Sequence, residues 1–414
     1  MNFFTIYGII LWILIWGSIM EYKISENVKS VKPSAIREIF KYMSVPRLIS
    51  FAAGNPSPES FPAEDMRTVA DGIFATQASS ALQYGSTEGY APLRNQIKDR
   101  LKNKFNSFSE NDELIITTGG QQGIDLCARA MLDPGDVVIC ESPTFIGALN
   151  AFRVCGARTV GVELEDDGIS IDGLEKALKE NPKAKILYLI PTFQNPSGIT
   201  TVQEKRKKVY ELAKKYGVIV LEDNPYGELR FSGKDVPTVK SLDTEGIVMY
   251  CSSFSKILSS GMRVGFLCGP KELIDRCVVI KQASDVHTNL FFQMLVSGYL
   301  EKYDLDAHIQ TIRELYFKKS SLMISALENG LDPSIRFTRP EGGLFVWVTL
   351  PKGDSTDIFK TCIDKKIAVV DGKTFLPSPA PCSSVRLNYS TPTDQQISDG
   401  ISIFCETVND YIKR

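Results

Sequence analysis

The chain has 414 residues, of which 43% are hydrophobic and 23% charged, and its 47 basic and 49 acidic residues nearly cancel. This is the composition of an ordinary globular protein with ample material for a core, and the balanced charge argues against a general nucleic-acid binder. The nine cysteines are scattered without a C-x-x-C pair, which indicates reduced thiols in a cytosolic protein. The two histidines, His287 and His308, stand at no zinc spacing, so we expect no metal site.

The first twenty residues, MNFFTIYGIILWILIWGSIM, carry no charge and are long enough to span a bilayer. They lack the positive start and the small-residue cleavage site of a signal peptide. One alternative is a membrane anchor, for which the flanking Lys23, Lys29 and Lys32 favour a cytoplasmic body. The other is a mis-assigned start, since Met20 opens an ordinary soluble sequence. Either way we expect the body of the protein in the cytoplasm, with a membrane contact only if residues 1–20 are a real leader.

Residues 21–60 are expected to form an N-terminal arm. Within it, Lys32–Ser44 has apolar residues at helical spacing, and the following stretch LISFAAGNPSPESFP is a loop rich in glycine and proline. This loop carries Gly54. We therefore expect the arm to be a short amphipathic helix followed by an irregular segment.

From residue 61 to residue 303, short apolar runs alternate with helical patterns. The runs rich in β-branched residues are Glu113–Gly120, Asp136–Glu141, Lys185–Pro191, Val218–Asp223 and Gly246–Ser253. Helical patterns at 121–132 and 202–217 separate several of them. Such alternation indicates a large α/β domain with a mostly parallel sheet covered by helices on two sides. Ligands of these sheets bind beyond the carboxyl ends of the strands.

A second pattern covers residues 304–414. A long helical stretch to about Asn329 leads into IRFTRPEGGLFVWVTLP, where apolar and polar residues partly alternate. IAVVDGKTF and SVRLNYS then give further short strands. We expect a smaller α+β domain with its helices on one face of the sheet.

Two segments could hold an anion such as a phosphate. TTGGQQGIDL places Gly120 and Gln121 at a strand-to-helix turn, where backbone N–H groups and a helix N-terminus point outward. YCSSFSKILSSGMRVGF sets Lys256 and Arg263 among several hydroxyls. The hydroxyls nearest to the lysine belong to Ser253 and Ser255. A Ser-rich surface loop with solvated charges is the alternative for the second segment taken alone.

The other strand ends carry groups that suit a planar ligand. Phe145, in ESPTFIGAL, either packs in the core or stacks on such a ligand. Asn195 precedes a proline in PTFQNPSGIT, a candidate cis peptide in a rigid loop. Asp223 ends a strand in LEDNPYGELRF, with Tyr226 three residues later. A buried aspartate at this place needs a cationic or hydrogen-bonding partner.

These groups together suit pyridoxal 5′-phosphate. Its aldehyde needs a lysine, its phosphate needs hydroxyls, an arginine and helix N–H groups, and its ring nitrogen needs a carboxylate. NPSG, EDNPYGELRF, SSFSKILSSGMRVGF and PEGGLFVWVTLP also occur in the order and spacing of one family. From about Lys32 to its end, the chain resembles the class I/II, fold-type I pyridoxal-phosphate aminotransferases. Within them it is most similar to the branch with the 2-aminoadipate and kynurenine aminotransferases.

The resemblance implies a role for each residue around the cofactor. Lys256 would form a Schiff base with the aldehyde and shuttle the proton, while Asp223 would pair with the ring nitrogen. Tyr226 and Asn195 would hydrogen bond to the phenolic oxygen of the cofactor, and Phe145 would stack on its ring. Many relatives have tyrosine where this chain has Phe145, so the stacking stays and a hydroxyl is lost. The phosphate would be held by Gly120, Gln121, Ser253, Ser255 and Arg263.

The same resemblance implies substrate and partner residues. Arg386, in SVRLNYS, matches the arginine that binds the substrate α-carboxylate, with Asn195 and the backbone of Gly54 lining the pocket. Arg37 matches a mobile helix that in some relatives brings an arginine to a distal carboxylate, although a solvated helix face explains it equally well. Tyr84, in QYGSTEGYAPLR, matches a tyrosine that relatives lend to the partner subunit. This implies a homodimer with shared active sites.

The predicted function is transfer of an amino group from an L-amino acid to a 2-oxo acid by a ping-pong mechanism. The expected donor is of the 2-aminoadipate, aromatic or branched aliphatic type, and the expected acceptor is 2-oxoglutarate. A lyase or decarboxylase of the same fold is one alternative, although Arg386 favours transamination. The effector module of a pyridoxal-phosphate-sensing transcription regulator is another. It would need a DNA-binding domain ahead of the fold, where this chain has only about thirty residues.

Overall fold

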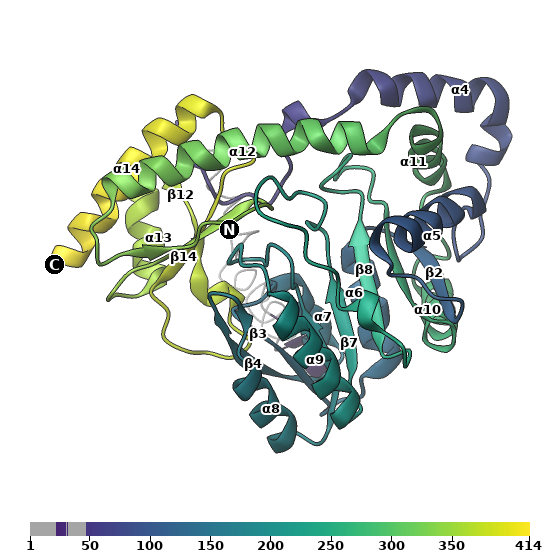
Figure 1. Ribbon diagram of the computed structural model, residues 1–414, viewed down its shortest axis with the longest axis horizontal. Coiled ribbons are helices and arrows are strands. Elements are labelled where there is room, and N and C mark those ends of the chain that lie inside the picture. The colour runs from purple at the N-terminus through teal and green to yellow at the C-terminus, as the bar shows by residue number, and fades with distance from the viewer. Residues whose placement is uncertain (1–21, 30, 32–46) are drawn as a thin grey trace, which may run out of the picture.

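The structure of the protein is a computed structural model that describes residues 22–29, 31 and 47–414 (Figure 1). The apolar leader 1–20, the helix predicted at 32–44 and Arg37 lie outside these residues. Across the described ranges, no helix has both the length and the apolar character needed to cross a membrane. The domain limits 21–60, 61–303 and 304–414 stay a prediction.

An eight-stranded sheet forms the centre of the larger part of the molecule, in the order β2-β9-β8-β7-β6-β3-β4-β5. The central strands β4, β3, β6, β7 and β8 pair in parallel, whereas β9 runs antiparallel to both β2 and β8. The mostly parallel sheet predicted from the apolar runs is therefore confirmed. The strands are β2 (Asp112–Thr117), β3 (Val137–Ser142), β4 (Arg158–Glu165), β5 (Gly168–Ile169), β6 (Ala184–Leu189), β7 (Ile219–Asp223), β8 (Val248–Ser253) and β9 (Gly265–Pro270).

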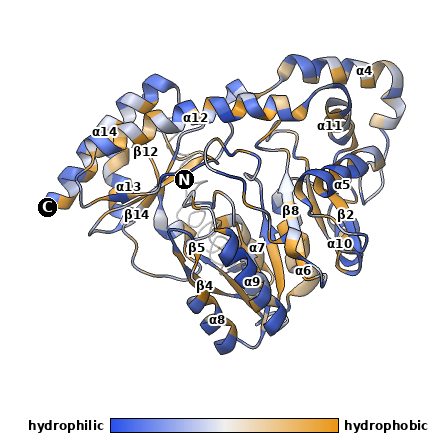
Figure 2. Cartoon of the chain, in the orientation of Figure 1, coloured by the Kyte–Doolittle hydropathy of each residue, from blue (hydrophilic) through white to orange (hydrophobic). Residues whose placement is uncertain are grey.

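Helices cover both faces of this sheet, as the alternating pattern predicted (Figure 1). α8 and α9 bury Leu174 and Val209 against one face, which includes Ile139 and Val220. α6, α7 and α10 pack on the opposite face. The strands are the most hydrophobic elements, and the outer faces of α8 and α9 are hydrophilic (Figure 2). The helices are α4 (Ala63–Ala81), α5 (Ala91–Phe105), α6 (Gly120–Met131), α7 (Ile146–Val154), α8 (Ile171–Glu180), α9 (Gln203–Tyr216), α10 (Lys271–Ser284) and α11 (Leu290–Lys302).

The C-terminal part is an α+β domain around an antiparallel sheet of order β10-β11-β14-β13. α12 runs from the large sheet to this domain and packs along α14 (Figure 1). It begins after Asp304, whose carboxylate accepts hydrogen bonds from two backbone N–H groups of the first turn. The elements are α12 (Leu305–Gly330), β10 (Arg336–Phe337), β11 (Phe345–Thr349), α13 (Ser355–Asp364), β13 (Val370–Asp371), β14 (Ser384–Asn388) and α14 (Asp394–Lys413).

The start of the described body is tied to the C-terminal domain. β1 (Ile49–Ser50) pairs in parallel with β12 (Ile367–Ala368). The pairing continues beyond β1, because Phe51 N donates to Ala368 O at 2.8 Å and Asn388 N donates to Phe51 O at 2.8 Å. These bonds carry the glycine- and proline-rich loop past β14. The remaining short helices are α2 (Glu26–Lys29), η1 (Pro58–Ser60), η2 (Lys240–Leu242) and η3 (Gly372–Phe375).

Candidate active site

The candidate site lies where the carboxyl ends of the parallel strands meet the loop that follows β1. The strands that deliver its residues are β2, β3, β6, β7 and β8, whose last residues include Thr117, Ser142, Asp223 and Ser253. Parallel strands end at the same edge of a sheet, so the segments that follow them converge there. The structure thus brings together most of the residues that the sequence analysis singled out.

Asp223 is the buried carboxylate of the site. Its Oδ2 accepts a hydrogen bond from the phenol of Tyr188 at 2.8 Å. Burial raises the pKa of Asp223 to about 7, and the Tyr188 hydrogen bond only partly offsets this. Among the described residues, no lysine or arginine is positioned to lower that pKa further. A bound cation would stabilise this carboxylate, as the protonated ring nitrogen of pyridoxal 5′-phosphate would.

A turn between β2 and α6 forms an anion site. Gly119 has φ +73°, a backbone conformation that favours glycine, and a Cβ there would lie 2.3 Å from Nη2 of Arg263, which would have to move. α6 begins at Gly120 with no side chain capping its first turn, which leaves backbone N–H groups available. The guanidinium of Arg263 is exposed and approaches Thr118 O, with Nη2 at 3.4 Å. The arginine and the helix N-terminus thus face the same spot.

Hydroxyls and an aromatic ring complete the surroundings of this anion site. Ser253, the last residue of β8, and Ser255, two residues later, are both buried. Phe145 precedes α7, and Gln121 donates from Nε2 to Gly147 O at 2.9 Å. A Cβ on Gly147 would lie 2.2 Å from Gln121 Oε1 and 2.5 Å from the Phe145 ring, so these two side chains are neighbours. The position of Phe145 is compatible with the stacking role that was predicted for it.

Tyr226, Asn195 and Arg386 form one buried chain of contacts. Asn195 Nδ2 donates to Tyr226 Oη at 3.5 Å, and Arg386 Nη1 donates to Asn195 Oδ1 at 2.9 Å. The Asn195–Pro196 peptide is cis, as the sequence suggested. Burial raises the pKa of Tyr226, so the phenol keeps its proton and can donate a hydrogen bond. This chain of contacts links β14 of the C-terminal domain to the loops after β6 and β7.

Arg386 presents a buried guanidinium with unused hydrogen-bond capacity. Its Nη2 donates to Ala52 O at 2.8 Å, but its Nε has no hydrogen-bond partner in the described part of the chain. The guanidinium carbon lies 4.2 Å from the ring centre of Phe345 and 5.1 Å from that of Phe375. Burial lowers the pKa of Arg386 to about 10, which still leaves it charged near neutral pH. A carboxylate bound beside the guanidinium would pair with its charge.

Lys256 is buried close enough to Arg263 and Arg386 for both positive charges to act on its amine. Its Nζ donates to Gly54 O at 2.7 Å, so the loop after β1 holds the amine. Burial, together with the positive charges of Arg263 and Arg386, lowers the pKa of Lys256 from 10.5 to about 8. A substantial fraction of the amine is therefore neutral near physiological pH. A neutral amine can bind an aldehyde or accept a proton.

Tyr84 does not contact the site of its own chain, and Arg37 cannot be placed. Tyr84 is 80% exposed, and its ring packs edge-on against His287 with the centroids 5.7 Å apart. Its hydroxyl makes no hydrogen bond to any residue that the structure describes. Arg37 lies outside the described residues. The roles of Tyr84 and Arg37 therefore stay predictions.

Tyr188 and Glu141 are buried polar residues beside the site that the sequence analysis did not single out. Glu141 accepts hydrogen bonds from Ile190 N at 3.1 Å and Gln194 Nε2 at 3.2 Å, and burial raises its pKa to about 7. Each belongs to a short apolar run, Glu141 to VVICE and Tyr188 to ILYLI, and a polar side chain in such a run could have pointed to it.

Comparison with known proteins agrees with this geometry. The family described as "Aminotransferase class I and II" matches residues 46–404. Aromatic-amino-acid aminotransferase 1 of Thermococcus litoralis is 38% identical over 94% of this chain and 95% of its own length. A Pyrococcus horikoshii kynurenine aminotransferase, solved in complex with PMP, has 37% identity and a TM-score of 0.92, covering 96% of this chain and 99% of that one. LysN, the α-aminoadipate aminotransferase of Thermus thermophilus solved with N-(5′-phosphopyridoxyl)-L-leucine, has 34% identity and a TM-score of 0.87, covering 94% and 98%.

The environment of Lys256 predicts a titration that can be measured in protein freed of bound cofactor. Competitive labelling of amines across pH, read by peptide mass spectrometry, should show Lys256 half-reactive at about pH 8. Arg263→Gln removes a neighbouring positive charge and should raise that midpoint. Exposed lysines of the same sample provide the internal reference. A midpoint at or above the ordinary value of 10.5 would show that the amine is not buried as described.

Proposed function

Because the chain belongs to the class I and II aminotransferases, we propose that this site holds pyridoxal 5′-phosphate and moves an amino group from an L-amino acid to a 2-oxo acid. The observation that carries the proposal is the buried carboxylate of Asp223, which lacks a cationic partner among the described residues. Lys256 and Arg386 supply the amine and the carboxylate receptor that the reaction needs in the same pocket. The relatives with aromatic, kynurenine and aminoadipate names indicate the class of donor.

The residues at the site fit the cofactor. When bound, pyridoxal 5′-phosphate supplies an aldehyde that condenses with primary amines and a protonated ring that withdraws electrons. Asp223 would hold the ring nitrogen, and Tyr226 with Asn195 would donate to the phenolic oxygen. Phe145 would cover one face of the ring. The phosphate would be bound by the backbone of Gly120 and Gln121 and by the side chains of Ser253, Ser255 and Arg263.

Lys256 is proposed to be the group that binds the cofactor at rest and carries the proton during the reaction. As a neutral amine its Nζ can accept the proton from the substrate Cα, and Gly54 O keeps that amine in place. A pKa of about 8 suits this task because the amine can both accept and return a proton near neutral pH. The donor would leave as its 2-oxo acid before the acceptor enters, which is a ping-pong mechanism.

Arg386 is proposed to orient the substrate through its α-carboxylate. The guanidinium is held by Asn195 and Ala52, so its plane is fixed before the substrate arrives. Asn195 and the backbone of Gly54 would line the same end of the pocket. We propose 2-oxoglutarate as the acceptor, and its second carboxylate needs a further donor. Arg37 remains the candidate that the sequence offers.

This proposal predicts a kinetic pattern and a labelled lysine. With an aromatic donor and 2-oxoglutarate varied against each other, double-reciprocal plots should be parallel. Lys256→Ala should lower kcat by about 10²-fold or more, because it removes the proton carrier. Lys271→Ala, which changes an exposed lysine paired with Asp275 on α10, serves as the control and should leave kcat unchanged. Borohydride should fix the cofactor to the peptide containing Lys256, and a label on another lysine would refute the assignment.

We further propose that the active enzyme is a homodimer in which Tyr84 reaches the phosphate in the partner subunit. The support is that Tyr84, Leu82 and Phe74 are large side chains left 80%, 75% and 50% exposed in one small region of the chain. A monomer rarely leaves such side chains together in water, and a second subunit would cover them.

Shared sites can be tested by mixing two chains that are impaired at different residues, at a cofactor concentration too low to saturate the Tyr84→Ala chain. In a heterodimer of Lys256→Ala with Tyr84→Ala, the chain that keeps its lysine receives a normal tyrosine from its partner. That site should recover, giving up to about half of the activity per dimer, whereas neither homodimer is restored. Tyr84→Ala alone should weaken cofactor binding about tenfold or more by loss of a charge-assisted hydrogen bond. No recovery in verified heterodimers would place Tyr84 in its own subunit's site or outside any site.

A further inference from the structure

A buried ion pair lies behind the turn that forms the anion site. Lys281, near the end of α10, is completely buried, and its amine lies 2.8 Å from a carboxylate oxygen of Asp285. The same amine donates to Gln122 Oε1 at 2.7 Å and to Thr288 Oγ1 at 3.0 Å. Burying an ammonium is costly unless all of its N–H groups find acceptors, and those of Lys281 do. The amine therefore needs no ligand of its own.

Asp285 connects this ion pair to the turn between β2 and α6. Its Oδ2 accepts hydrogen bonds from Thr118 Oγ1 at 3.0 Å and from Gln122 Nε2 at 2.7 Å. The backbone N–H of Thr118 donates to Gln122 Oε1 at 2.7 Å. Thr118 is therefore held through both its side chain and its backbone, directly before Gly119.

The two charges also fix the orientation of the Gln122 amide. Its oxygen faces the ammonium of Lys281, and its nitrogen faces the carboxylate of Asp285. A reversed amide would place donor against donor at Lys281 and acceptor against acceptor at Asp285. The network thus has one arrangement of donors and acceptors, and Thr118 is bonded to two of its members.

Both parts of the anion site depend on where Thr118 lies. Gly119 follows it, and Gly120 begins α6, whose first turn has backbone N–H groups without a side-chain cap. The carbonyl oxygen of Thr118 lies 3.4 Å from Nη2 of Arg263, the guanidinium of the same site. A shift of Thr118 would therefore displace the backbone donors and remove a contact of the arginine together.

The backbone that follows Asp285 is strained. Val286 has φ +65°, which is unfavourable for a β-branched residue. The N–H groups of Asp285 and Val286 both donate to Lys281 O, at 3.0 Å and 3.1 Å, in a helix ending where glycine is the usual residue. Strain of this kind persists where the surroundings fix the backbone, and it is common at functional sites. The strain thus supports a role for the position of Asp285 beyond packing.

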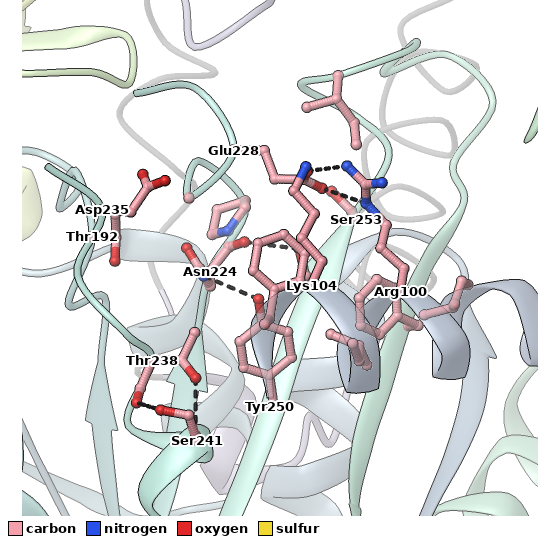
Figure 3. A pocket seen from close by; sticks show the side chains of 18 of the residues that line it. Arg100, Lys104, Thr192, Asn224, Glu228, Asp235, Thr238, Ser241, Tyr250 and Ser253 are labelled. Atoms are coloured by element: carbon pink, nitrogen blue, oxygen red, sulfur yellow. Dashed lines mark hydrogen bonds and ion pairs between the residues drawn. The ribbon is translucent and has the colours of Figure 1, made fainter. Parts of the chain in front are cut away.

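Another charged cluster beside the large sheet lacks such a connection. Arg100 and Lys104 pair with Glu228 in the wall of a cavity of about 420 Å³ (Figure 3). Within the described chain, the hydrogen bonds of these two cations go to Glu228 and Asp306 and not to the turn at Thr118. Charged clusters near the sheet thus need not reach the anion site.

We propose that Lys281 and Asp285 are positioning residues for the phosphate of the cofactor. They hold Thr118, and through it the N-terminus of α6 and the guanidinium of Arg263, in one fixed arrangement. The pair is neutral as a whole, so it orders the turn without adding a net charge that would repel the phosphate. This inference rests on the proposed function, because it takes the anion to be the phosphate of pyridoxal 5′-phosphate.

The test compares pyridoxal 5′-phosphate with pyridoxal, which lacks the phosphate, on protein freed of bound cofactor. Dissociation constants are measured from the absorbance of the bound ligand. Asp285→Asn keeps the shape of the side chain, but its NH₂ group must face either Lys281 or the donors of Thr118 and Gln122. This variant should bind pyridoxal 5′-phosphate about tenfold more weakly and pyridoxal as the wild type does.

Thr118→Val tests the connection itself. It removes the hydroxyl that donates to Asp285 and leaves the ion pair of Lys281 and Asp285 in place. Binding of pyridoxal 5′-phosphate should weaken about threefold or more, again without a change for pyridoxal.

A second buried pair provides the matched control. Lys240 is 4% exposed and pairs with Asp112 at 2.7 Å and with Asp243 at 2.9 Å. Asp112 begins β2, so this pair lies at the end of the strand away from Thr118. Asp243→Asn changes a buried lysine–aspartate pair of the same kind and should leave the ratio of the two dissociation constants unchanged.

A merely structural role for Lys281 and Asp285 would weaken both ligands alike. The inference is overturned if Asp285→Asn loses affinity for pyridoxal as much as for pyridoxal 5′-phosphate, or loses it for neither. It is also overturned if Asp243→Asn shows the same selective loss.

Inorganic phosphate separates this inference from the proposed function. A wild-type protein that does not bind pyridoxal 5′-phosphate would refute the proposed function. Inorganic phosphate, titrated onto the cofactor-free protein and followed by phosphorus NMR, tests the turn in either case. Asp285→Asn should bind it about tenfold more weakly than the wild type, and equal binding would overturn the inference.

Discussion

The buried carboxylate of Asp223 is the constraint on which the rest of the site depends. It ends the central strand β7 under helices on both faces, where water cannot solvate it, and its one hydrogen-bond donor in the described chain is the phenol of Tyr188. A carboxylate in this position is either protonated or paired with a cation that the described chain does not supply. The sheet therefore provides a fixed negative charge for a ligand that brings its own positive one. A heterocycle with a basic nitrogen meets that requirement. The carboxylate keeps the nitrogen protonated, and the protonated ring withdraws electrons more strongly.

The positive charges of the site are arranged in the complementary way. Arg263 lies at the N-terminus of α6 and Arg386 lies on β14 of the other sheet, and the charges of both act on the amine of Lys256. Both arginines lower the pKa of that amine, in addition to burial. A phosphate at Arg263 and a carboxylate at Arg386 would neutralise these charges, so each ligand that binds changes how readily Lys256 takes up a proton. The amine is thus electrostatically coupled to the occupancy of its own site.

The strand ends of the large sheet were predictable because buried parallel strands have continuous apolar sequences. Asp223 and Ser253 are the last residues of two such strands. The antiparallel direction of β9 could not be predicted. Gly265–Pro270 is as apolar as the neighbouring parallel strands, and the direction of a strand leaves no signal in its local sequence. The contacts of Arg386 could not be predicted from the sequence around it either. They depend on the pairing of β1 with β12, which joins segments more than 300 residues apart and brings Ala52 to the guanidinium. Tyr188 was missed because the register of β6 on β7 places its hydroxyl, and register is set by the whole sheet.

The measurement that tests the central claim most directly is a single half-reaction. Purified holoenzyme is mixed with an aromatic or 2-aminoadipate-type amino acid without any acceptor, and the 2-oxo acid formed is counted per chain. The account predicts one 2-oxo acid per bound cofactor, after which formation stops until 2-oxoglutarate is added. Carbon dioxide or ammonia released continuously in the absence of an acceptor would contradict it, because the site would then run a decarboxylation or an elimination.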